Sequence, residues 1–505
     1  MSGPAGTGRT YRLAPPDRTG AILGLSHRSV AVLAVGLVAA VLAFTAGAAP
    51  VGIAAAAAAV GLVVVRLDGG PLLETLPVRL GWARSRAARR NSWRATLPLP
   101  VEASSPPWPP TLDGLRLLAV GPELHGWAGA GEIGVVWDQR CGLVSATVAV
   151  SGGHFGLVDP GEQDSAVARW GEALAGFVRE RAGVAQVCWT EWAAPAGISE
   201  HLSWLADHCH QPESPAAHAY RDLVAGAAPA ATGHQVTVTV TVQVGRPTAR
   251  AGARTARSAR TAAIGVLGGE VRLFADRLTA GGLKVSPPWN VGGLAAGIRA
   301  RLDPAARPAT TPLSASLGMA AGLVRPADAG PLATEAAWEW WRADGSYHRS
   351  FYVSDWPRLA MPAGWLGPLL GWAGCVRSLS VVLEPVSPRR SAQEVRRAAT
   401  KLDSDSAHRS AQGFRVGAGL RRSAEAVAER EEELVAGYRE MTYAGIVTLT
   451  AGSVEDLDRR SDDLTQMAGA SGVELRALHG RHDQAFAVGL PVGRGLIPPR
   501  RWGPR

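Results

Sequence analysis

The chain has 505 residues, 47% of them hydrophobic, and a formal net charge of +9. This length allows two or three domains with cores of their own. Arginine carries almost all of the positive charge, since Lys284 and Lys401 are the only lysines. Compositional bias and a membrane-proximal basic patch explain this balance, so we expect no direct nucleic-acid binding.

The N-terminal part of the chain predicts a membrane anchor. Residues 1–28 are polar and basic and predict a flexible cytoplasmic tail, whereas Val30–Val65 contains no charged residue. Because about 20 apolar residues span a bilayer, this run predicts two helices, broken near Pro50, where the N–H donor is missing. We therefore expect a transmembrane helical hairpin over residues 29–66. A signal peptide cleaved near Ala46-Gly47-Ala48 is the alternative, but the apolar run starts late and continues beyond that point.

Arginines on both sides of the apolar run predict the topology. The positive-inside rule places both termini and the soluble domains in the cytoplasm, with two spans in the plasma (inner) membrane. Residues 67–110 then form a basic juxtamembrane segment and a Pro-rich linker. The apolar face of this segment suits anionic headgroups, and equally a connector helix covered by neighbours. The arginines expected at the membrane surface are Arg79, Arg84, Arg86, Arg89, Arg90 and Arg94.

Beyond the linker, the pattern of residues predicts two α+β domains. The first covers residues 111–304; its clearest strand is His234–Val244, where Val alternates with Thr or Gln. In this domain we also expect the strand Leu115–Val120 and the helices Ser165–Ala182, Ala216–Ala227 and Val291–Leu302. A linker over residues 305–333 leads to the second domain, 334–497, and residues 498–505 form a tail. The order strand–strand–helix–strand–helix–strand is expected in both. The predicted fold class is therefore α+β, with a transmembrane hairpin followed by two cytoplasmic lobes of similar element order.

Two segments of the second domain are candidate partner surfaces. Ser391–Glu440 is strongly charged and predicts two helices with little core face, so Arg421 and Arg422 are either solvated or meet a charged partner. A predicted hairpin around Asp344-Gly345 is rich in aromatic residues, which either pack within a sheet or bind a partner. Its candidate residues are Trp338, Trp340 and Trp356.

The sequence contains no recognisable catalytic constellation. The motifs GxxxxGK[ST], GxSxG and HExxH are absent. His208-Cys209-His210 is the densest group of metal-ligand types, but adjacent side chains diverge and no second ligand pair follows at zinc-site spacing. We therefore expect a protein that is not an enzyme, with no catalytic residue, no cofactor and no metal.

Several segments resemble a known family. They are Gly20–Ser26 before the apolar hairpin, Ile298–Arg307, Tyr347–Trp356 (YHRSFYVSDW) and Thr442–Leu490. The chain resembles actinobacterial conjugation-like, type IV secretion-like membrane proteins: a TrbD-type two-span hairpin fused to the N-terminal platform of TrbE/TraC-type ATPases. In those ATPases a RecA-like motor follows the step that corresponds to Leu490-Pro491; none follows it in this sequence.

The resemblance implies a platform without catalytic residues. Its partners would be other subunits of the secretion or conjugative DNA-transfer apparatus, including a separate motor ATPase, and self-association into a homo-oligomer stays open. Two other functions are also open on the sequence. One is a type VII (ESX) secretion membrane component, EccE-like, which also has two N-terminal spans; the other is a membrane-tethered enzyme of unknown type.

Overall fold

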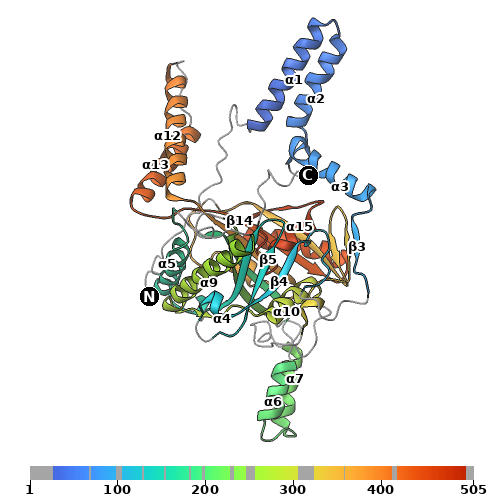
Figure 1. Ribbon diagram of the computed structural model, residues 1–505, viewed down its shortest axis with the longest axis vertical. Helices are drawn as coiled ribbons and strands as arrows, with labels where there is room; N and C mark the ends of the chain where they lie inside the picture. Colours follow the sequence, from blue (N-terminus) through green and yellow to red (C-terminus); the bar gives the residue numbers. More distant parts are fainter. Residues whose placement is uncertain are drawn as a thin grey trace, which may run out of the picture.

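A computed structural model of the chain describes residues 27–67, 70–97, 105–127, 130–152, 155–180, 183–195, 199–227, 232–245, 256–304, 324–357, 359–411 and 418–495. These residues form a mixed α+β protein around a 13-stranded antiparallel sheet, which confirms the predicted α+β class (Figure 1). The strand order is β3-β10-β11-β12-β14-β13-β7-β8-β6-β5-β4, with β9 beside β6 and β15 beside β12. The expectations for residues 1–26, 305–323 and 498–505 lie outside the described residues.

The first half of the chain that follows β3 contains both strands and helices. The predicted Val/Thr alternation becomes β8, in which the valines face one side of the sheet and the threonines the other. The strands are β4 (Leu115–Val120), β5 (Ile133–Asp138), β6 (Leu143–Ser151), β7 (Val184–Pro195), β8 (Thr232–Gln243) and β9 (Lys284–Val285). The helices are α4 (Pro122–His125), α5 (Pro160–Ala175), α6 (Ser199–His208), α7 (Pro215–Ala227), α9 (Ala256–Ala280) and α10 (Val291–Leu302).

The second half follows the same plan. The charged segment Ser391–Glu440 forms the two helices that its composition predicts. The strands are β10 (Ala333–Ala336), β11 (Trp341–Ala343), β12 (Ser346–Asp355), β13 (Val376–Pro385), β14 (Met441–Ala451) and β15 (Glu474–Ala477). The helices are α11 (Gly367–Leu370), α12 (Pro388–Ala411), α13 (Ala418–Val435), α14 (Val454–Ala470) and α15 (His482–Val488).

The two halves share one pairing scheme. In the first, β6 pairs with β8 and β9, and β8 pairs with β7; in the second, β12 pairs with β14 and β15, and β14 pairs with β13. The halves meet where β7 and β13 run antiparallel, with Thr190 opposite Ser380. Repeating one scheme on both sides of an antiparallel pair gives the sheet an approximate two-fold axis normal to its surface. The helical pair between β7 and β8 and the pair between β13 and β14 therefore project from opposite ends of the central strands, as Figure 1 shows.

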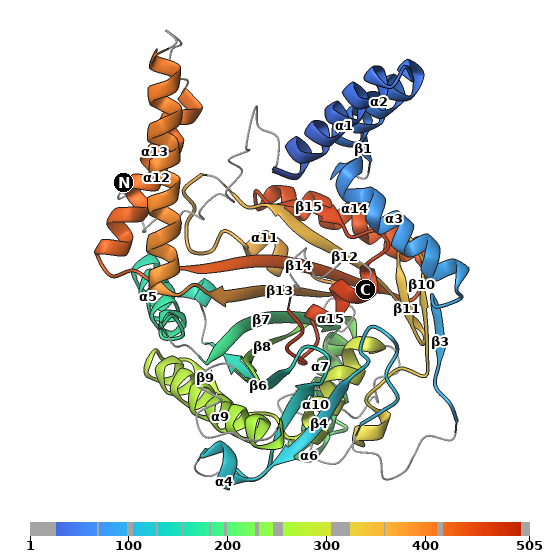
Figure 2. The same cartoon turned by 45° about the horizontal axis from the view of Figure 1, so that its top comes forward.

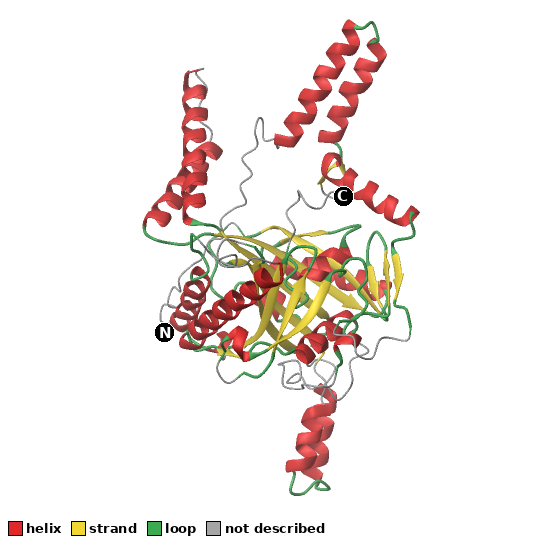
Figure 3. Cartoon of the chain, viewed as in Figure 1, coloured by secondary structure: helices red, strands yellow, loops and turns green. Residues whose placement is uncertain are grey.

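Helices cover both faces of the sheet. On one face, α5 and α9 pack against the valines of β6 and β8, while α11 and α14 cover Leu379, Val447 and Leu449. Trp189 touches both of these clusters, so they form one continuous layer. On the other face, α10 and α15 pack around Trp289 and Phe486. Figure 3 shows the helices gathered around the strands in this way.

The N-terminal segments attach to the edge of the sheet. They are α1 (His27–Thr45), α2 (Ala49–Val64), β1 (Arg66–Leu67), β2 (Gly70–Pro71), α3 (Leu72–Ala87) and β3 (Ser92–Arg94). Helices α1 and α2 pack side by side, and β3 pairs with β10 at the edge of the sheet. The segment expected to be only a juxtamembrane connector and linker therefore supplies an edge strand.

A buried charged group lies at the junction of β7 and β13. Arg377 and Glu191 are both almost fully buried, and Arg377 Nη2 lies 3.7 Å from Glu191 Oε1. His234 Nδ1 lies 2.6 Å from the same oxygen. Arg377 also donates to the carbonyls of Leu370 and Trp372 and so holds the C-terminal end of α11. One cation thus links both halves of the sheet to a covering helix.

We expect Arg377→Met to lower the free energy of unfolding by about 3–5 kcal/mol, because it leaves the carboxylate of Glu191 buried without its arginine partner. Arg377→Met combined with Glu191→Gln should recover part of this loss, since the unpaired charge is removed. Chemical denaturation of the full chain in detergent, followed by tryptophan fluorescence, measures both variants. A single variant as stable as the wild type would contradict this role of the pair.

Candidate functional site

The α1–α2 hairpin exposes apolar side chains and packs through small ones. Leu42 and Ile53 are 62% and 61% exposed. Between the helices, a side chain at Gly36 would collide with Ala59, and one at Gly52 would collide with Ala40 O and the Phe44 ring. Apolar residues outside and small residues at the helix contact are typical of helices packed in lipid. Of the two, Arg28–Thr45 is long and apolar enough to cross a membrane, and α2 is apolar but shorter.

Helix α3 fastens this hairpin to the sheet. The rings of Trp82 and Trp338 meet edge to face with centroids 5.4 Å apart, and Arg79 lies 5.1 Å from the centre of the Trp338 ring. Trp338 also stacks on His479, which follows β15. The joint is therefore aromatic, and it holds the base of the hairpin against the second half of the sheet.

The arginines predicted for the membrane surface divide into two groups. Arg79 is half-buried against Trp338 and belongs to the joint. The others are exposed on α3 and the turn and strand that follow it, with Arg86 also lying over the Trp82 ring. These exposed residues are Arg84, Arg86, Arg89, Arg90 and Arg94.

The predicted aromatic surface is engaged largely within the chain. Trp340 meets Tyr347 edge to face, and Trp356 meets both Trp365 and Tyr443. Trp338, Trp340 and Trp356 are all half-buried. The structure therefore places these tryptophans in intramolecular packing, the first of the two roles the sequence left open for them.

Two helical arms stand out from the sheet in opposite directions. Arg421 and Arg422 are exposed in the first turns of α13, on the α12–α13 arm. The α6–α7 arm was only half predicted, because α6 was missed. It exposes Trp204 (54%), Tyr220 (42%) and Leu223 (68%). The signal for α6 was the spacing of His201, Trp204 and His208, three and four residues apart, whose rings stack in the structure.

Three of the segments that carry the family resemblance lie against one another within the described residues. At the end of α10, Arg299 pairs with Asp344, and Asp303 Oδ1 accepts a hydrogen bond of 2.7 Å from Ser346 Oγ. His348 Nε2 lies 3.0 Å from Leu302 O. β12 in turn pairs with β14 and β15. Residues 298–304, 347–356 and 442–490 thus form one packed unit.

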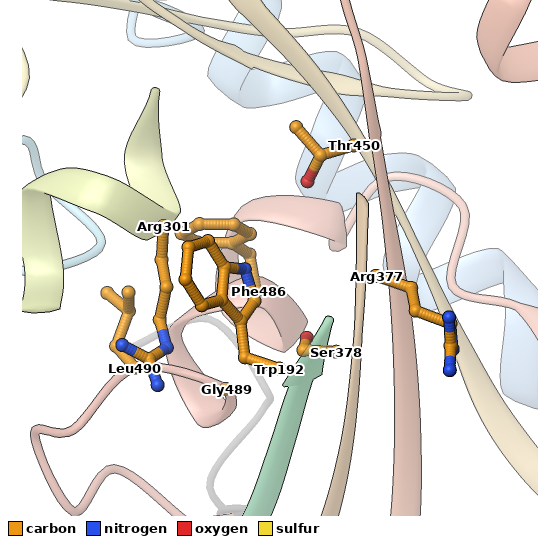
Figure 4. Close-up of a pocket in the computed structure, with 8 residues that line it drawn as sticks. All are labelled: Trp192, Arg301, Arg377, Ser378, Thr450, Phe486, Gly489 and Leu490. Carbon is orange, nitrogen blue, oxygen red and sulfur yellow. The ribbon is translucent and has the colours of Figure 1, made fainter. Parts of the chain in front are cut away.

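One cavity lies inside this unit. Its volume of about 10 Å³ is room for a single water molecule at most. Figure 4 shows Arg301 and Trp192 beside it, while the guanidinium of Arg377 points away. Arg301 donates to Gly297 O and Gln235 Oε1 and lies over the Trp192 ring; burial lowers its pKa to about 10, so it stays charged at neutral pH. The cavity is too small for a nucleotide or an organic substrate.

A second cavity, of about 400 Å³, lies on the opposite face over the β7–β13 junction. Its lining is apolar and includes Trp170, Trp189, Leu174 and Leu383. It contains no nucleophile, acid or base. Among the described residues, no group of three or more His, Cys, Asp or Glu side chains could hold a metal ion.

The face that carries the smaller cavity is lined with hydroxyl groups. Thr147 and Thr239 are hydrogen-bonded at 2.9 Å, and Thr190 and Ser380 at 3.0 Å, across neighbouring strands. The segment after α15 covers these strands, where Ser145 Oγ donates to Val492 O. These five hydroxyls bond to each other and to the backbone, which is how buried polar groups avoid a desolvation penalty, whereas Thr241 Oγ1 on the same face is buried without a partner among the described residues. The bonded hydroxyls hold the C-terminal segment on the sheet.

His348 is the titratable member of this face. Its Nδ1 lies 2.9 Å from Thr450 Oγ1, and its Nε2 faces Leu302 O, so the neutral ring satisfies both contacts. Burial lowers its pKa to about 3, and burial lowers that of His482 to about 3 as well. Both side chains are therefore neutral in the folded protein at physiological pH.

Comparison with known proteins adds no relative. No protein-family model matches the chain, and no curated protein matches its sequence. The candidate function therefore rests on the residues and geometry above.

We expect the free energy of unfolding to fall as the pH is lowered from 7 to 5. Each buried histidine has a folded-state pKa of about 3, so the unfolded chain, with a histidine pKa near 6.5, binds more protons over this range. The contribution of each buried histidine to the free energy of unfolding is therefore fully present above pH 6.5. It decreases below pH 6.5 and has fallen by about 2 kcal/mol per histidine at pH 5.

His348→Gln should roughly halve this pH dependence, although it also lowers the stability at pH 7. His218→Gln is the matched control, because His218 is exposed. Denaturation midpoints at pH 5, 6 and 7 measure the effect. An unchanged slope in His348→Gln would show that this ring is not the proton-linked group.

Proposed function

We propose that the chain is a non-catalytic, membrane-anchored platform of a type IV secretion-like or conjugation-like apparatus that docks a separate motor ATPase. The α1–α2 hairpin would span the plasma membrane twice, with both flanks and the sheet in the cytoplasm. The proposal rests mainly on one observation. The hairpin, with its exposed apolar side chains, and the α6–α7 arm, with its exposed aromatic side chains, project from opposite sides of one sheet (Figures 1 and 3).

The hairpin supports anchoring through its surface chemistry. Large apolar side chains such as Leu42 and Ile53 would be costly in water but are favourable in lipid. Basic residues lie before the beginning of the apolar run, at Arg28, and directly after its end, at Arg66. The turn around Gly47, which connects the two helices, carries none. This distribution is what the positive-inside rule associates with a cytoplasmic location of both flanks.

The α6–α7 arm supports partner docking. It projects away from the hairpin, so its exposed surface faces the cytoplasm in this topology. Exposed Trp and Tyr side chains beside a leucine are the residue types that anchor protein interfaces. Of the two cavities described above, the smaller holds at most one water molecule and the larger is lined by apolar side chains, which fits a platform better than a tethered enzyme.

We expect Trp204→Ala together with Leu223→Ala to weaken binding of the motor ATPase at least about tenfold, since truncating a tryptophan that anchors an interface costs about 2 kcal/mol or more. Binding is measured with the full chain in detergent or nanodiscs, titrated with purified ATPase. Leu157→Ala is the control, because Leu157 is 86% exposed but lies outside the arm.

Unchanged ATPase binding by the double variant would place the interface elsewhere. A full chain that binds an ESX core complex and no conjugation-type ATPase would instead identify the EccE-like alternative, which has the same kind of anchor.

A further inference from the structure

The α12–α13 arm lies on the membrane side of the molecule. Figures 1 and 2 show that this arm and the α1–α2 hairpin leave the sheet on the same side, while α6–α7 leaves on the other. Because α12 has 24 residues, it carries the end of the arm roughly 36 Å from its base at 1.5 Å per residue. In both views the hairpin leans away from the arm. The arm ends higher in the picture than the beginning of α1, but along the tilted axis of the hairpin the two lie close together.

Charge is distributed unevenly along the arm. Helix α13 runs from the end of the arm back towards the sheet, and its first turns carry Arg421 and Arg422. Its second half carries four glutamates and one arginine, Arg430. Helix α13 is therefore basic where it begins, at the distal end of the arm, and acidic towards the base.

Several charges near the base of the arm form ion pairs with other described residues, whereas the two arginines at the start of α13 do not. Arg430 pairs with Glu394 and Glu440, and Arg390 also pairs with Glu394. Arg421 and Arg422 are exposed, and neither forms an ion pair within the described part of the chain. They also stand in the first turns of α13, where the helix dipole favours negative charge. An external anion would relieve both unfavourable features.

We propose that the distal end of the α12–α13 arm, marked by Arg421 and Arg422, is a second membrane contact that binds the headgroups of anionic lipids. This inference rests on the proposed anchoring by α1–α2, which brings a bilayer to this side of the molecule. Arg84, Arg86, Arg89 and Arg90 are also exposed, on α3 and the turn that follows it, in the segment that connects the hairpin to the sheet. The arm then holds the sheet at a fixed tilt beneath the membrane.

The charge pattern favours lipid over an acidic protein. A bilayer meets only the end of the arm, near Arg421 and Arg422. A protein docking along the α13 side of the arm would also meet the glutamates of this helix, which repel an acidic surface. Basic clusters next to a membrane span are a recognised signature of anionic-lipid contact.

The test uses the full chain in nanodiscs that contain either one-third phosphatidylglycerol or phosphatidylcholine alone. A photo-crosslinking amino acid replaces Ala411, the exposed last residue of α12, and lipid adducts are counted by mass spectrometry. We expect adducts with the anionic discs and at least about fivefold fewer with neutral discs or at high salt.

Matched variants locate the contact. Arg421→Glu with Arg422→Glu should remove most of the adducts. Arg396→Glu with Arg397→Glu makes the same charge change on an exposed arginine pair closer to the base and should leave them unchanged. The cross-linker at Trp204, on the opposite arm, should label no lipid.

Three results would overturn the proposal. Equal labelling in neutral discs, or labelling insensitive to Arg421→Glu with Arg422→Glu, would exclude a headgroup contact. Cross-linking of Ala411 to added motor ATPase in place of lipid would assign the surface to a protein partner. A full chain that does not enter nanodiscs at all would refute the proposed anchoring itself, whereas incorporation without lipid adducts refutes only this inference.

Discussion

The pairing of β7 with β13 is the constraint on which the rest of the structure depends. Seven residue pairs, from Arg377 opposite Ala193 to Leu383 opposite Val187, join strands that belong to different halves of the chain. Without this ladder there would be two smaller sheets, each with an unprotected edge that invites aggregation. With it, the two halves share one apolar layer through Trp189 and one buried charge group through Arg377.

The antiparallel sense of that pairing also decides where the two helical arms lie. Each arm is inserted at the same place in its half, after β7 or after β13. Because β7 and β13 run in opposite directions, the two arms leave the sheet at opposite ends of its strands. The arms differ in character: α6–α7 carries exposed aromatic side chains, and α12–α13 carries charge. A single topological rule thus produces a molecule with two chemically distinct ends.

Much of the local structure could be predicted from the sequence. Leu115–Val120 and Val291–Leu302 form a strand and a helix at the predicted bounds, because strong periodicity coincides there with clear ends. The first helix after the β5–β6 hairpin was expected over 165–182 and instead begins at Pro160. The missed signal is Asp159, which accepts a hydrogen bond from Glu162 N as an N-cap, followed by proline at the first helical position.

The tertiary arrangement could not be predicted in the same way. Nothing in the residues of β7 or β13 specifies that these two strands, nearly 200 residues apart, pair with each other rather than with external partners. The aromatic joint between Trp82 and Trp338 was hidden for the same reason: each tryptophan was noticed, but their contact depends on the fold. For the candidate site, the sequence identified Arg421 and Arg422 as exposed charge but not the side of the molecule on which they lie.

The central claim is that the α1–α2 hairpin anchors this sheet on the cytoplasmic side of a membrane. Topology reporters fused after Gly20 and after Pro100, on either side of the hairpin, test it most directly. The account predicts a cytoplasmic signal from both positions, because basic residues flank both ends of an uncharged hairpin. An external signal from either fusion would contradict the two-span anchor and favour a single span or a cleaved leader.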